Sequence, residues 1–377
     1  MNTSKFFKTA MSLCAAGTVG LGATPTARAL ELTITNQNTN FNDNNVYVMF
    51  ERVEGGNVSS KTPYSLAQLP KPVKVDRAFG RIFISLGQPL QNVNAPNFNN
   101  PTLPDYGVRW DKIEWTIDGS PTQCANLSSA DFFSVPLKIS NGSTELGWRD
   151  HTGNIFNKLK ATAGNINADP VIPGNGPSGV VRVISPSTTA NPGAYASMSP
   201  YIGFMEGKTT PISGDEMGGY DYDARISNGS LVMTGKNRSA GHSMSVDAGQ
   251  LPIQGLYKCD PQWVVDGQAG WNFSKNDVYC AAMRDVLAGF NLGFVGSSVT
   301  NPHTGQPFGN GPSSSWQNTE TRLAYAGAQP SQPFYNQYAN VIAQASDSYG
   351  FPFTDRYVHK PLLNLSGKNL NIIVQGD

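Results

Sequence analysis

Two carboxylates in one short stretch have the types and spacing that could support acid and base chemistry. Glu114 lies in a run that alternates apolar and polar residues, and Asp131 follows it by 17 residues, across a Gly-Ser-Pro turn. Strict alternation predicts a strand, and it puts Glu114, Thr116 and Asp118 on one face. If the strands on the two sides of the turn are neighbours, both carboxylates project into one groove. Hydrolysis of a glycosidic bond needs two such groups, an acid that protonates the leaving oxygen and a carboxylate that attacks the sugar or activates water. Spacing alone also fits two ordinary surface acids.

Other catalytic patterns find little support. The segment 174–179, GNGPSG, formally fits a dinucleotide glycine pattern, but it contains Pro177 and leads into a strand instead of a helix. The four histidines are scattered, and neither a CxxC nor a Gly-x-Ser-x-Gly motif is present. We therefore expect no cofactor, no metal site and no serine-hydrolase chemistry.

An acidic cluster in the middle of the chain allows three interpretations. It contains Asp215, Glu216, Asp221 and Asp223. It could form a solvated loop with one Asp paired to Arg225, a calcium site, or a rim that contacts sugar.

The elements around these residues predict a β-rich start and a mixed middle. Short alternating runs fill residues 30–141, and a returning strand is expected at 370–376. Helical periodicity appears after Asp150, at 276–294 and at 332–350, with a long loop at 297–331. We predict a mainly β, α+β fold, in which a β-barrel or sandwich lobe (about 30–145 and 346–377) and a mixed α/β lobe (about 146–345) form an open groove.

The first 29 residues have the pattern of a secretory signal peptide. Two lysines precede a weakly apolar run that ends in Ala27-Arg28-Ala29, so the mature chain should begin near Leu30. We expect a secreted protein, extracellular or periplasmic. No later apolar run reaches roughly 18 residues, so no membrane span is expected.

Composition indicates a neutral partner. Lys and Arg together number 27, as do Asp and Glu, and only 14% of residues are charged. A nucleic-acid footprint and a polybasic membrane patch are therefore absent. A low-charge chain rich in Asn, Gly and Tyr suits hydrogen bonding and stacking with a carbohydrate. We expect a monomer.

The cysteines fit an exported protein with one disulfide. Cys14 leaves with the signal peptide, so Cys124, Cys259 and Cys280 remain. We predict a bridge between Cys259 and Cys280 because they are close in sequence. Cys124 is then either a buried thiol or a partner in another bridge.

Several motifs together resemble glycoside hydrolase family 64, β-1,3-glucanases with a thaumatin-like barrel. The segment IEWTID…NLSSADFFSVPLKI is similar to the family's Glu-x-Thr-x-Asn strand and its Asn-Ile-(Ser/Thr)-x-x-Asp-Phe-x-x-x-Pro-Leu motif. VRVISP and YNQYANVIAQASDSYGFPFTDRY resemble later family motifs in the same order. These collinear matches span roughly Val108 to Tyr357, most of the mature chain.

The resemblance implies roles for individual residues. It makes Glu114 the general acid and Asp131 the general base of an inverting mechanism that releases short oligosaccharides from laminarin-type β-1,3-glucan. Thr116, Asp118 and Ser128 fall at sugar-contacting positions, and so does Asp355 near the C-terminal end. Phe351 and Phe353 match the same groove segment, although they could equally be core residues.

Three positions depart from the family's pattern. Asp118 stands where Asn is usual, Ser128 where Thr is frequent, and Cys124 where an aromatic residue is expected. Asp118 is either a functional neighbour of Glu114 or a residue that starts the turn before Gly119. These departures bear on affinity and product length. They leave open a non-catalytic, thaumatin-like glucan-binding or antifungal protein, and the third alternative is a secreted structural protein without a saccharide groove.

Overall fold

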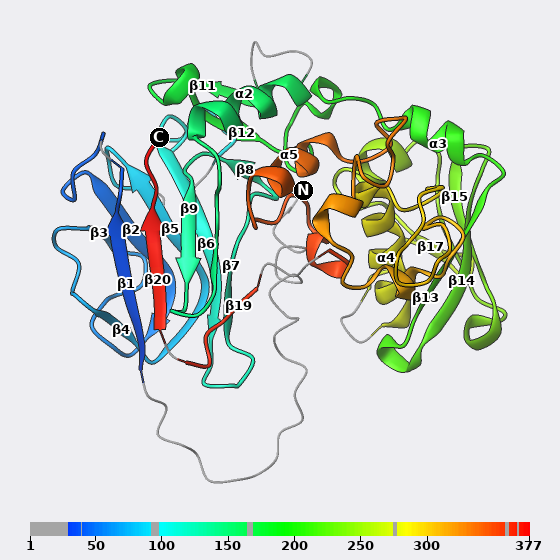
Figure 1. The fold of residues 1–377 in the computed structure, drawn as a ribbon, viewed down its shortest axis with the longest axis horizontal. Helices are drawn as coiled ribbons and strands as arrows, with labels where there is room; N and C mark the ends of the chain where they lie inside the picture. Colours follow the sequence, from blue (N-terminus) through cyan, green and yellow to red (C-terminus); the bar gives the residue numbers. More distant parts are fainter. Residues whose placement is uncertain are drawn as a thin grey trace, which may run out of the picture. The chain divides into compact units, whose positions relative to one another are not determined.

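The computed structural model describes residues 29–38, 40–91, 98–163, 169–273, 277–358, 362–367 and 369–377. Apart from Ala29, the predicted signal peptide lies outside these ranges. The chain divides into two compact units (Figure 1). Unit 1 contains residues 1–191, 345–349 and 361–377, and unit 2 contains residues 192–344 and 350–360. Within the described ranges, no helix has the length and apolar character needed to cross a membrane.

The described residues of unit 1 form strands and one α-helix. Its strands are β1 (Leu30–Asn36), β2 (Val46–Glu54), β3 (Pro63–Ser65), β4 (Val73–Val75), β5 (Arg77–Leu86), β6 (Arg109–Ile117), β7 (Cys124–Leu127), β8 (Phe132–Phe133), β9 (Leu137–Ser140), β10 (Glu145–Gly147), β11 (Val171–Pro173), β12 (Val180–Ile184), β19 (Leu363–Asn364) and β20 (Asn369–Val374). The helix is α2 (Thr152–Thr162), and η2 (Pro177–Gly179) is a short 3-10 turn.

Two open sheets of unit 1 share one apolar core. One has the strand order β10-β9-β20-β1-β4 and the other β19-β7-β6-β5-β2-β3. Both contribute the side chains of one large cluster, in which Leu32, Ile82, Trp115 and Ile372 are buried. The arrangement among the described residues is a sandwich, with no closed barrel. Each fully buried aliphatic side chain of this kind stabilises the fold by about 1.5–3 kcal/mol.

The last strand returns to the first lobe, as the sequence predicts, and there it pairs with the first strand. β20 pairs in parallel with β1 and antiparallel with β9, and Figure 1 shows the red C-terminal strand beside the blue first strand. In β1 the buried and exposed residues alternate, which is the pattern of a strand with one face in a core.

A β-bulge in β5 sets which residues face outward near the middle of the sheet. The register with β2 shifts between Phe50 and Arg52, so two residues of β5 lie opposite one residue of β2. Gly80 has a φ of +96° at this bulge, and a Cβ there would lie 2.6 Å from Glu51 Oε2. Only glycine fits, and Arg81 follows it on the outer face.

A three-stranded sheet extends unit 1 beyond the predicted lobe. Its order is β11-β12-β8, and β8 directly follows Asp131. The barrel lobe was predicted to end near residue 145, whereas unit 1 continues to Asn191, because β12 pairs with β8. The glycine-rich segment 174–179 connects β11 and β12, which are antiparallel.

Unit 2 combines one antiparallel sheet with helices. Its sheet has the order β13-β14-β15-β16-β17-β18. The strands are β13 (Thr209–Gly214), β14 (Tyr220–Ser227), β15 (Ser230–Gly235), β16 (Ser243–Val246), β17 (Val264–Val265) and β18 (Gln268–Ala269). The α-helices are α3 (Ser199–Met205), α4 (Val278–Leu292) and α5 (Gln337–Ala345). Shorter helical turns are η3 (Pro192–Ala194), η4 (Glu216–Gly218), η5 (Asn237–Ser239), η6 (Leu251–Gly255), η7 (Ser313–Trp316), η8 (Thr321–Leu323) and η9 (Thr354–Arg356).

Local signals explain where two helices begin and end. Asp277 Oδ1 accepts a hydrogen bond from Tyr279 N at the start of α4, and Gly293 takes the left-handed conformation at its end. α5 ends at Ala345, earlier than the predicted end at Gly350. The reason is that the next residues are extended: Ser346 bridges to Trp148 and Tyr349 to Ser128.

Candidate active site

Glu114 lies in the middle of the outer face of β6. Apolar residues of β6 alternate into the sandwich core, so Lys112, Glu114 and Thr116 share the opposite face. Glu114 is directly opposite Arg81 of β5 and Asn126 of β7. The predicted strand and its two faces are therefore confirmed.

The Glu114 carboxylate has a cation on one side and an amide on the other. Asn126 Nδ2 donates to Glu114 Oε2 at 3.2 Å, and Arg81 Nε lies 3.8 Å from Oε1. Glu114 is only 8% exposed, whereas the Arg81 side chain is 24% exposed. A cross-strand hydrogen bond thus holds Oε2 of the carboxylate, and Oε1 has a longer ion pair with Arg81.

Asp131 belongs to the same face through Lys112. Lys112 Nζ lies 2.9 Å from Asp131 Oδ2, and both side chains are almost fully buried. Lys112 is two residues before Glu114 on β6, so its side chain is on the same face of the strand as Glu114. Lys112 thus connects Asp131 to the face that carries Glu114. The structure brings the predicted pair to one face of the sheet.

The backbone of Asp131 is held from the other side by the segment after β12. Its carbonyl oxygen accepts hydrogen bonds from Ser185 N at 2.8 Å and from Thr188 Oγ1 at 2.7 Å. β8 then pairs with β12, where Phe132 lies opposite Ile184. These contacts place Asp131 at the start of a strand whose position does not depend on its own side chain.

A buried aspartate that sequence reasoning did not single out fixes the chain just after β8. Asp111 Oδ2 accepts from Ser134 N at 3.0 Å and from Val135 N at 3.2 Å, and Oδ1 accepts from Lys112 N. Burial raises the pKa of Asp111 to about 6, although the Lys112 charge and these backbone hydrogen bonds act in the opposite direction.

A buried arginine packs against the other end of this site. The Arg182 guanidinium lies 5.4 Å from the Trp110 ring centroid and 5.3 Å from that of Phe132, and it donates to Phe98 O. Burial lowers the pKa of Arg182 to about 9, against the opposing charges of Asp111, Tyr106 and Asp105. This aromatic and cationic packing closes the outer face beyond Lys112.

The predicted sugar-contacting residues of unit 1 fall in three different settings. Thr116 is partly exposed on the Glu114 face, opposite Cys124 of β7. Ser128 is buried and its backbone bridges to Tyr349. Asp118 Oδ1 accepts a hydrogen bond from Ser120 N at 2.9 Å, which is the turn-starting arrangement. The functional roles of all three stay predictions.

The C-terminal family segment is divided between the two units. Tyr349 belongs to unit 1, whereas Asp355 belongs to η9 of unit 2 and is partly exposed. Phe351 is fully buried and Phe353 is partly buried. The core interpretation therefore fits Phe351. The proposed sugar contact of Asp355 stays a prediction.

The predicted disulfide between Cys259 and Cys280 is wrong. Both cysteines are free and buried. Cys259 Sγ is 3.7 Å from Leu256 O and from Asn291 Nδ2, and burial raises its pKa. Cys280 lies in the first turn of α4, where burial also raises its pKa. Closeness in sequence does not bring Cβ atoms within the roughly 3.8 Å that a disulfide requires. Cys124 is buried on β7.

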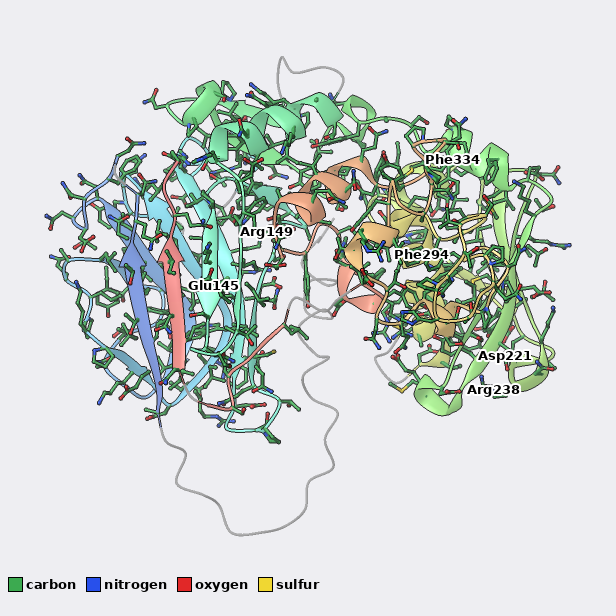
Figure 2. All side chains as sticks on the ribbon, viewed as in Figure 1. Glu145, Arg149, Asp221, Arg238, Phe294 and Phe334 are labelled. Atoms are coloured by element: carbon green, nitrogen blue, oxygen red, sulfur yellow. The ribbon has the colours of Figure 1, made fainter. Side chains whose placement is uncertain are left out.

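The acidic cluster is a set of ion pairs on η4 and β14, and the predicted partner Arg225 is not the one found. Asp215 and Asp221 pair with Arg238, which lies beside Asp221 in Figure 2. Asp223 pairs with Lys236, and Glu216 pairs with Arg284 and Arg356. The solvated loop, one of the three interpretations, misses β14, because the acids obscured the alternation of that strand. Across the described ranges, no three His, Cys, Asp or Glu side chains are grouped to hold a metal ion.

Four residues of the site were missed at first. The same alternation that selected Glu114 could have selected Lys112, which is two positions earlier. Asn126 had a weaker signal, two positions before Ser128. Arg81 and Asp111 had none, because their contacts depend on strand register and on the path of the chain after β8.

Comparisons with known proteins give the family and the fold of the chain. The sequence model of the family described as glycoside hydrolase 64, β-1,3-glucanase, matches residues 42–361. No curated protein matches the chain significantly. Among solved structures, a laminaripentaose-producing β-1,3-glucanase in complex with laminaritetraose is 18% identical, with 94% of this chain and 99% of that chain covered and a TM-score of 0.60.

Two further structures have a similar fold. A β-1,3-glucanase domain from Clostridium beijerinckii is 15% identical, with 94% of this chain and 100% of that chain covered and a TM-score of 0.61. A laminaripentaose-producing β-1,3-glucanase from Paenibacillus barengoltzii, complexed with laminarihexaose, is 15% identical, with 94% and 76% covered and a TM-score of 0.53. At these identities the likeness establishes the shared fold.

Proposed function

The chain belongs to glycoside hydrolase family 64, the β-1,3-glucanases, and we propose that it is a secreted, inverting endo-β-1,3-glucanase. Glu114 is its general acid and Asp131 its general base. The observation that carries this assignment is the outer face of β6, which holds Glu114 and also Lys112, whose Nζ pairs with Asp131. The substrate is a laminarin-type glucan, and the products are short oligosaccharides.

Inversion assigns a separate task to each carboxylate. Glu114 protonates the glycosidic oxygen as the bond to the anomeric carbon breaks, and Asp131 removes a proton from the water that attacks from the opposite side of the sugar. The mechanism requires the two carboxyl groups to be roughly 6.5–9.5 Å apart, because the water must fit between the base and the sugar. Thr116, Asp118, Ser128 and Asp355 are proposed to contact the glucan.

The two carboxylates differ in the cations beside them. Lys112 Nζ is 2.9 Å from Asp131 and buried, whereas Arg81 Nε is 3.8 Å from Glu114 and partly exposed.

The test uses purified protein with laminarin and three variants. Glu114→Gln and Asp131→Asn should each lower kcat by roughly 10²–10⁴-fold, the usual contribution of a general acid or base. Glu145→Gln is the matched control, since Glu145 is an exposed carboxylate paired with Lys138 on the same unit. Proton NMR of the first products should show the α-anomer.

Each outcome has a defined meaning. An initial β-anomer would exclude inversion, and undiminished hydrolysis by Glu114→Gln would remove Glu114 as the acid. A wild-type protein that binds laminarin without releasing sugar would instead be the glucan-binding alternative. Secretion rests on the pattern of residues 1–29, and N-terminal sequencing of exported protein, with Leu30 expected first, tests it.

A further inference from the structure

Lys112 is a buried cation next to the proposed base. It is only 3% exposed, and its Nζ lies 4.4 Å from the Phe132 ring centroid as well as 2.9 Å from Asp131 Oδ2. The ammonium makes this ion pair without hydrogen-bond geometry, and it donates no hydrogen bond to the described residues. Burying an ammonium costs several kcal/mol unless an anion compensates it, and here Asp131 is that anion.

The two oxygens of Asp131 are not equivalent. Oδ2 faces Lys112, whereas Oδ1 is buried and accepts no hydrogen bond from any protein donor among the described residues. The Asp131 carbonyl is held by Ser185 and Thr188, so the backbone is fixed independently. With one end of the side chain held by the backbone and one oxygen by Lys112, Oδ1 is the oxygen left to accept a proton.

We propose that Lys112 is a positioning residue for hydrolysis: its ammonium holds Oδ2 of Asp131 and so directs Oδ1 toward the attacking water. The inference rests on the proposed function. In the step it serves, the water oxygen bonds to the anomeric carbon while Oδ1 takes one water proton. The bond from that carbon to the glycosidic oxygen breaks as this oxygen takes the proton of Glu114. Asp131 ends protonated and Glu114 ionised, and exchange with solvent restores both.

The experiment compares Lys112→Met and Lys112→Arg with wild type, using laminarin. Lys112→Met should lower kcat roughly 10–100-fold, a part of the 10²–10⁴-fold that a general base supplies, and leave KM within about twofold. Lys112→Arg retains a cation for Oδ2 and should restore most of the wild-type kcat.

Lys138→Met is the matched control. Lys138 Nζ is 2.8 Å from Glu145 Oε1, close to the Lys112–Asp131 distance, but its side chain is 29% exposed and belongs to β9. It should leave kcat unchanged. The other charged groups on the elements around Asp131 stay unaltered in these variants: Asp111 and Glu114 of β6, Arg81 of β5 and Arg182 of β12.

The outcomes separate this inference from the proposed function. A Lys112→Met enzyme with wild-type kcat overturns the role of Lys112, even when Asp131→Asn is inactive. Full activity of Asp131→Asn instead removes the base assignment itself. If Lys112→Met does not fold, Lys112→Leu, which likewise has no donor for Oδ2, takes its place with the same two outcomes.

Discussion

Buried carboxylates in the two units of this protein are satisfied to different degrees. In unit 1, Asp131 Oδ2 has Lys112, but Oδ1 has no protein donor within the described part of the chain. In unit 2, both oxygens of Asp285 are engaged: Oδ1 with Arg356 Nε, and Oδ2 with Tyr220 Oη at 2.6 Å and Ser313 Oγ at 3.0 Å.

The other carboxylate of this network in unit 2, that of Glu216, also has a partner on each oxygen. Arg356 also pairs with Glu216 Oε1, and Arg284 pairs with Glu216 Oε2 at 3.1 Å. Burial, followed by the charge of Asp285, raises the pKa of Tyr220, so its hydroxyl remains a donor. A buried polar group is normally paired because leaving it unpaired is costly. The difference therefore indicates that Asp285 holds the fold together, whereas Asp131 is available for chemistry.

The largest expected effect on stability comes from breaking the saturated network. Asp285→Asn removes the charge that compensates Arg356 and should destabilise the protein by about 3–5 kcal/mol. Urea unfolding at pH 7 measures this loss, and kcat of the protein that remains folded should stay near wild type. Asp215→Asn is the control, because that carboxylate is exposed and pairs with Arg238 at the surface. An Asp285→Asn protein that keeps its stability but loses activity would contradict this prediction, because Asp285 would then serve catalysis and not the fold.

A second prediction uses the pH dependence of Asp111 in unit 1. Burial raises its pKa from 3.8 to about 6. The folded state therefore holds this proton more tightly than the unfolded state, so the contribution to stability is complete below about pH 4 and is lost as pH rises through about 6. The shift corresponds to about 3 kcal/mol.

Asp111→Asn should remove this part of the pH dependence. Free energies of unfolding, measured in urea from pH 4 to 7, should fall more steeply with pH in wild type than in the variant. Parallel curves for the two proteins would show that Asp111 does not titrate in this range. If the variant has wild-type activity at pH 7, the role of Asp111 is limited to holding the chain after β8.

The smallest effect is expected for Asp377, a carboxylate of unit 1 whose two oxygens both have a partner. Asp377 Oδ1 and Oδ2 accept from Arg109 Nη2 at 2.7 Å and Nη1 at 2.9 Å. Burial alone would raise the pKa of Asp377, but Arg109 lowers it below its ordinary value. Asp377→Asn should cost about 1.5 kcal/mol at pH 7, the lower end of the range for hydrogen bonds to charged groups.

The stability that the Asp377 pair contributes changes with pH in the opposite direction from the contribution of Asp111. A lowered pKa gives stability above the ordinary range of Asp, and this stability disappears as pH falls through the folded value. The difference between wild type and Asp377→Asn in urea should therefore shrink from pH 7 to pH 3. If Asp377→Asn lowered kcat but not the free energy of unfolding, then having a partner on both oxygens would not distinguish structural carboxylates from catalytic ones.

Much of the fold could be predicted because each segment shows its own pattern. Alternation located β1, β2, β5, β6 and β20, and periodicity located α4, whose Asp277 and Gly293 mark its ends. β14 was missed because its outward residues are acids and its neighbours are glycines. α5 ended early because Ser346 and Tyr349 pair with distant strands, and such pairing leaves no local signal.

What the sequence by itself determined is the face of β6 that carries Glu114 and Thr116, because side chains of a strand alternate with a period of two. It also determined the family, through motifs that occur in order along the chain. Only the tertiary structure decided that Arg81 and Asn126 flank Glu114, that Lys112 meets Asp131, and that Cys259 and Cys280 do not bridge. These contacts depend on strand register and on which segments pack together, and neither is encoded within a single segment.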